Sequence, residues 1–118
     1  MRLAPCPKTP NCVSTEAPAG DPHHMDPIPY QGGREAARQR LLAVLGRLER
    51  TRIVESTPDS IRAECRSRIF RFVDDVELLL DDAAKVIRFR SAARVGVGDH
   101  GVNRARMKRI GREFLAAK

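Results

Sequence analysis

The sequence contains no tryptophan and only one tyrosine and four phenylalanines. Proteins that bind single-stranded nucleic acid stack bases on aromatic side chains beside basic residues, so this composition argues against such a surface. The formal net charge is nevertheless +7, and residues 93–118 hold seven Lys or Arg against two acids. A basic terminal helix attracts phosphate polyanions. Because no nucleic-acid-reading motif accompanies it, we do not expect nucleic acid as a partner.

Long apolar runs are also missing. No segment approaches the ~20 apolar residues that a transmembrane helix needs, so we expect no membrane span. Residues 1–5 lack the apolar stretch of a signal peptide. We therefore expect a cytoplasmic location for the chain as given, and association with the cell envelope if a leader was removed. A length of 118 residues suits a single domain.

Cysteine is scarce, with three residues in the chain. Cys6 and Cys12 precede His23 and His24, but their spacing is not C-x₂-C and no fourth ligand is evident. We expect no metal or other cofactor, with Cys6, Cys12 and His24 as the weak candidates for a metal site. The pair also fits free thiols or a disulfide that closes a short loop. Cys65 lies in an apolar alternation and fits a small core residue.

The composition divides the chain in two. Residues 1–32 hold seven of the eight prolines, which remove backbone donors and disfavour helix. They predict an irregular N-terminal arm that packs on the domain. Residues 33–118 carry regular patterns and predict a single α+β domain.

Within that domain, apolar periodicity predicts two helices, at 34–50 and 102–117. Four alternating segments between them predict strands at 51–56, 60–67, 73–80 and 86–91, joined by short turns. Short connections make antiparallel neighbours, because a parallel crossover needs a dozen or more residues. We expect a two-layer sandwich, in which a four-stranded, mainly antiparallel sheet carries both helices on one face.

A glycine motif follows the last predicted strand. Gly96, Gly98 and Gly101 form a literal G-x-G-x-x-G, the pattern that cradles a pyrophosphate in dinucleotide-binding folds. That fold needs a parallel strand after the helix and an acid about 20 residues on. The chain has neither, which argues against a dinucleotide site. The loop remains either a tight connection with Asp99 capping the helix, or an anion site between Arg94 and Arg104.

Charged residues alternate along the predicted strands. Arg62, Glu64 and Arg66 share one face, and the register could place Asp75 and Glu77 between arginines on both sides. The alternatives are a solvated charged face or a polar pocket in which carboxylates meet arginines. The candidate ligand-binding residues are Arg66, Asp74, Asp75, Glu77, Arg90, Ser91, Arg94, Asp99, Asn103 and Arg104.

Several of these segments together resemble a known family. Cys6-Pro-Lys-Thr-Pro-Asn-Cys-Val-Ser14, a F-V-D-D-V-E run ending at Glu77, and R-x-G-x-x-D-x-G-x-N-R ending at Arg104 are similar to the bacterial and plastid family called domain of unknown function 1499. The resemblance covers nearly the whole chain and implies no established activity. It implies envelope or thylakoid association, since family members often carry a membrane or lipoprotein leader. The matching positions are Cys6, Pro10, Asn11, Cys12, Arg66, Asp74, Asp75, Glu77, Ser91, Arg94, Gly96, Asp99, Gly101, Asn103 and Arg104.

Two functional hypotheses follow from the charged residues. The preferred one is a non-catalytic binding module whose charged pocket takes a small anionic ligand or an acidic partner segment. The alternative is an enzyme that uses Asp74, Asp75 or Glu77 as acid/base or cation ligand, while Arg90 and Arg94 hold an anionic substrate. No catalytic residue is assigned by spacing, and we lean against an enzyme.

Overall fold

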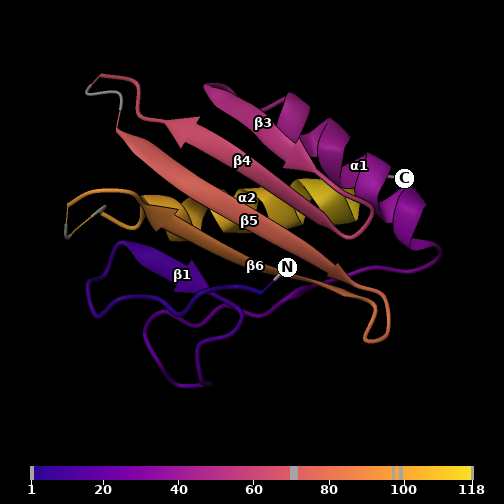
Figure 1. Ribbon diagram of the computed structural model, residues 1–118, viewed down its shortest axis with the longest axis horizontal. Helices are drawn as coiled ribbons and strands as arrows, with labels where there is room; N and C mark the ends of the chain where they lie inside the picture. Colours follow the sequence, from indigo (N-terminus) through magenta and orange to yellow (C-terminus); the bar gives the residue numbers. More distant parts are fainter. Residues whose placement is uncertain (1, 70–71, 97, 99, 118) are drawn as a thin grey trace.

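A computed structural model describes residues 2–69, 72–96, 98 and 100–117. The described chain forms a six-stranded antiparallel sheet and two helices, and Figure 1 shows both helices on the far side of the sheet. The strand order is β1-β6-β5-β4-β3, with β2 also paired to β6. The elements are β1 Cys12–Ser14, β2 Ile28–Pro29, α1 Arg34–Gly46, β3 Thr51–Ser56, β4 Ser60–Arg66, β5 Val73–Asp81, β6 Val86–Ala93 and α2 Val102–Ala116.

The core lies between the sheet and the helices. Alternation along β5 turns Val76, Leu78 and Leu80 toward the helices, where all three are buried. Ile87 and Phe89 of β6 pack beside them, as the alternation predicts. The helices complete the cluster with Ala37, Leu41, Val44, Leu45, Met107, Ile110 and Phe114.

The first helix is shorter than predicted. It ends at Gly46 rather than at residue 50. Glycine is a poor helix residue, since its backbone loses more freedom than that of alanine. Arg50 then adopts the left-handed backbone conformation, with φ of 52°, and this redirects the chain into β3.

The N-terminal arm belongs to the sheet, so the prediction of four strands is wrong. β1 pairs with β6 through Cys12↔Ala92, Val13↔Ser91 and Ser14↔Arg90. β2 continues along the same edge through Ile28↔Ile87. In Figure 1 the arm follows the edge of β6. The strands form here because the backbone groups on this edge of β6 would otherwise have no partner in the sheet.

A histidine fixes the turn between the two arm strands. The Nε2 atom of His23 lies 2.9 Å from the Thr9 carbonyl oxygen, and Nδ1 lies 2.7 Å from Asp21 Oδ1. The bond to Thr9, and then the bond to Asp21, raise the pKa of His23 above its usual value. The protonated imidazole therefore stabilises the arm.

We expect the protein to lose stability as the pH rises above neutrality. A group whose pKa is raised by folding contributes fully below its unfolded pKa, about 6.5 for histidine. That contribution disappears as the pH rises through the folded pKa. Urea unfolding from about pH 6 upward checks this. His23→Gln should make the free energy of unfolding depend less steeply on pH. Part of the dependence should remain, because bonds to the Ala17 carbonyl and to Asp26 also raise the pKa of His24. An equal slope in His23→Gln and in the wild type would contradict the assignment.

Neither of the two described helices is a candidate membrane span. Within residues 2–69, 72–96, 98 and 100–117, neither helix has the length and apolar character that crossing a bilayer requires.

Candidate functional site

The predicted site residues lie on both faces of the sheet. Because side chains alternate along β5, Asp75 and Glu77 point to the face without helices, called here the outer face. Asp74 has the parity of Val76 and points toward α2. Arg66, Arg90 and Arg94 accompany Asp75 and Glu77, whereas Ser91 and Asn103 lie with Asp74. Asp99 falls outside the described residues.

A groove of about 770 Å³ runs over the outer face, and we call it the outer groove. It lies over strands β3 to β6. Its charged lining residues are Glu55, Asp59, Arg62, Asp75, Glu77, Arg90 and Arg94.

Strand register decides which charges meet in this groove. Glu77 lies opposite Arg62 on one side and Arg90 on the other, as the alternation predicts. Asp75 instead lies opposite Glu64 and Ala92, so the expected arginines on both sides of Asp75 are wrong. Like charges opposite each other destabilise a sheet unless a cation joins them.

Arg94 supplies that cation from just beyond the end of β6. It donates to both carboxylate oxygens of Asp75, at 3.1 and 2.6 Å, and to Glu64 Oε2 at 3.1 Å. Arg94, and then Arg52, lower the pKa of Glu64, and the two carboxylates raise the pKa of Arg94. Arg94 thus holds two neighbouring acids together, and few of its donors remain for a ligand.

Arg90, unlike Arg94, has no close acceptor for its donors among the described residues. Its side chain is only 16% exposed, yet its nearest acceptors are Glu77 Oε1 at 3.7 Å and the Pro5 carbonyl at 3.5 Å. Its Nε atom is buried and has no hydrogen-bond partner among the described residues. A buried donor without an acceptor is costly. Across Glu77, Arg62 has only a 3.9 Å contact with Glu55. Spare donor capacity in the outer groove is therefore concentrated in Arg90 and Arg62.

The opposite face of the sheet holds a polar cluster, called here the inner network. Asp74 pairs with Arg106 at 2.8 Å, and both side chains are largely buried. Arg106 also donates to Asn103 Oδ1 at 2.7 Å, and Ser91 Oγ donates to the same atom at 2.6 Å. Asn103 Nδ2 reaches the Asn11 carbonyl at 3.3 Å. The network joins β5, β6, α2 and the arm.

The sequence reasoning did not select Arg106. A local signal was available, because Arg106 lies three residues after Asn103 and such residues share a helix face. Asp74 therefore lies on the opposite face of the sheet from Asp75 and Glu77, so the three carboxylates of the enzyme hypothesis do not share one site.

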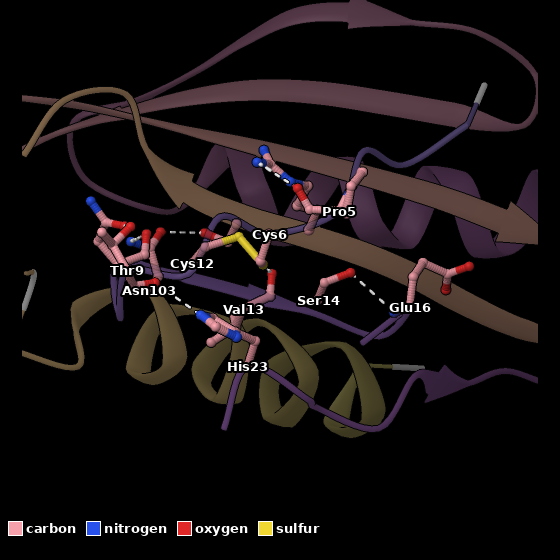
Figure 2. Close-up of a disulfide and its surroundings, with 12 residues drawn as sticks. Pro5, Cys6, Thr9, Cys12, Val13, Ser14, Glu16, His23 and Asn103 are labelled. Carbon is pink, nitrogen blue, oxygen red and sulfur yellow. Dashed lines mark hydrogen bonds between the residues drawn. A yellow bond between two sulfur atoms is a disulfide. The ribbon is translucent and has the colours of Figure 1, made fainter. Parts of the chain in front are cut away.

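The arm contacts both faces of the sheet, because the Pro5 carbonyl lies near Arg90 and the Asn11 carbonyl near Asn103. Cys6 and Cys12 are joined as a disulfide, so neither thiol is free to bind a metal. Figure 2 shows the disulfide with Thr9 and Asn103 near Cys12 on one side and Pro5 on the other. His24 contacts the Ala17 carbonyl and Asp26. Across the described residues, no group of three or more potential ligands could hold a metal ion.

The glycine loop lies between β6 and α2, and its described residues contact the arm. Gly96 and Gly101 have φ of 87° and 77°, a conformation that side chains disfavour. The Gly96 carbonyl accepts a bond from Asn11 Nδ2 at 2.7 Å. Arg104 donates to the carbonyls of Pro22 and His24 at 2.5 and 3.3 Å. These arm contacts occupy Arg104, which the sequence reasoning considered for an anion.

The chain matches one known family. The model for a family described as "Protein of unknown function (DUF1499)" matches residues 2–114. No curated protein and no solved structure matches the chain.

Proposed function

The chain belongs to the DUF1499 family, and we propose that it is a binding domain whose outer groove holds a small ligand through an anionic group on Arg90 and Arg62. The observation that carries the proposal is Arg90. Its guanidinium is largely buried, faces the groove and has a donor without an acceptor. A carboxylate accepts two parallel bonds from a guanidinium, which would satisfy that donor.

The other charged residues of the outer groove restrict the class of ligand that fits it. The groove lining contains four carboxylates, from Glu55, Asp59, Asp75 and Glu77, and three arginines. An acidic protein segment would bring several more carboxylates to a surface that already has an excess of them. A small ligand that carries a donor group beside its carboxylate fits better, because Glu77 between the two arginines can accept from that donor. We therefore favour a small zwitterion over an acidic partner segment.

Titration with glycylglycine, acetate and inorganic phosphate, followed by backbone amide shifts, tests this proposal. We expect saturable shifts along β4, β5 and β6 with glycylglycine, and weaker binding of the two simple anions. Arg90→Gln should weaken glycylglycine binding about tenfold, since it removes a charge-assisted pair of hydrogen bonds.

Arg88→Gln is the matched control. Arg88 lies on the same strand and face, but it pairs with Glu16 at 3.0 Å and does not line the groove. It should bind glycylglycine like the wild type. The proposal is wrong if no probe gives saturable shifts, or if both variants weaken binding equally.

A further inference from the structure

A second cavity lies on the helix side of the sheet, away from the outer groove. It has a volume of about 320 Å³ and is bordered by the segment between α1 and β3, the start of β3, the end of β4 and the first turns of α2. We call it the helix-end cavity. It shares no lining residue with the outer groove. We propose that the helix-end cavity binds a small amphipathic carboxylate, with its chain against the apolar wall and its head group on the arginine rim.

The wall of the cavity is apolar. Leu48, Val102 and Ala105 line it, together with the buried residue Cys65. Val102 is 47% exposed at the start of α2, and Ala105 is exposed one turn later. A ligand that covers these side chains removes apolar surface from water, which favours binding.

The rim of the cavity is cationic. Four arginines line it, Arg50, Arg66, Arg106 and Arg109, against the single carboxylate of Glu49. Arg50 already pairs with Glu49, and Arg106 pairs with Asp74 of the inner network. These two arginines are therefore satisfied by the protein itself.

Arg109 has donors to offer. It donates to Glu113 through Nε alone, so its two terminal nitrogens remain available within the described part of the chain. Arg66 also borders the cavity, but its side chain has the parity of Glu64 and belongs to the outer face, where its Nη2 atom lies 3.9 Å from Glu64 Oε1. The head group of the ligand therefore rests on Arg109 of α2.

Size and charge together select the ligand class. Ligand cavities in proteins span about 300–1,000 Å³, so this one suits a ligand at the small end of that range. The two free terminal nitrogens of Arg109 match one carboxylate rather than a polyphosphate. The apolar wall excludes a purely polar anion as the best ligand. A medium-chain monocarboxylate such as octanoate meets all three conditions.

Octanoate, kept below its micellar concentration, is the probe for this site. Amide shifts of Leu48, Val102 and Ala105 should saturate with octanoate. We expect 1-octanol, which has the same chain without the charge, to bind at least about tenfold more weakly. Inorganic phosphate, which has charge without a chain, should give no saturable shift there. Equal binding of octanol or of phosphate would overturn the proposal, because either the rim or the wall would then contribute nothing.

Two variants locate the site. Arg109→Gln should weaken octanoate binding about tenfold by removing a charge-assisted contact. Ala105→Leu fills the cavity from an exposed helix position, where leucine is well tolerated, and should abolish binding. Arg112→Gln makes the same charge change at an exposed position of α2 outside the cavity, and should leave affinity unchanged. If octanoate binds both lining variants like the wild type, or shifts only residues of the outer groove, the helix-end cavity is not its site.

Discussion

Replacing Asn103 with alanine is expected to lower the free energy of unfolding by about 3 kcal/mol. The side chain is fully buried, and its Oδ1 accepts from Ser91 Oγ and Arg106 Nη1 at 2.6 and 2.7 Å. Its Nδ2 donates to the Asn11 carbonyl at 3.3 Å. In the alanine variant, these partners lose their hydrogen bonds to Asn103 in a buried site. A buried polar group left unsatisfied costs more free energy than an average hydrogen bond contributes.

Helix propensity cannot produce this loss, because alanine is the better helix former. Val102→Ala is the matched control, since it changes the neighbouring position on the first turn of α2. Val102 is about half exposed, so its replacement should change stability by less than about 0.5 kcal/mol. Urea unfolding measures both variants. A loss below about 1 kcal/mol for Asn103→Ala would mean that the inner network contributes little to stability.

The alternation of side chains carried much of what the sequence could predict. The position of Glu77 between Arg62 and Arg90 follows from short turns, because a short turn between adjacent strands restricts their register. The same alternation places Asp74 on the helix side, with Val76. Grouping Asp74 with Asp75 as one pocket ignored this parity, and that part of the predicted site does not form.

Contacts between residues far apart in the sequence could not be predicted from the alternation of side chains. Arg106 meets Asp74 across 32 residues, and no local pattern specifies which strand residue a helix arginine reaches. The two strands of the arm are still harder to predict from the sequence. β1 has three residues and pairs with β6 near the other end of the chain, so no turn fixes its register. Its prolines argued for irregular structure, whereas the unpaired edge of β6 decides the outcome.

Removal of the Cys6–Cys12 disulfide is expected to cost about 2 kcal/mol of the free energy of unfolding. The bond closes a short loop, with a sequence separation of 6, and a short loop restricts the unfolded chain only modestly. Cys12 is the first residue of β1, so the bond also keeps residues 7–11 close to the edge of β6. In the double variant Cys6→Ser/Cys12→Ser, we expect faster amide hydrogen exchange at Val13 and Ser14 than in β4 or β5.

The same variant separates the disulfide from the residues that form it. A dithiol reductant transfers two electrons to the bond and yields two thiols, so it should destabilise the wild type by the amount that the double variant loses. The double variant itself should not respond to the reductant, since the remaining Cys65 is a buried free thiol. Equal stability of the wild type with and without reductant would show that the arm is held by its strand pairing and by the bonds of His23, Asn11 and Arg104 instead.

Arg90 offers a second readout for the disulfide, because its contact with the Pro5 carbonyl depends on the segment next to Cys6. If the disulfide holds that segment over the outer groove, reduction should change glycylglycine binding in the wild type and leave the double variant unaffected.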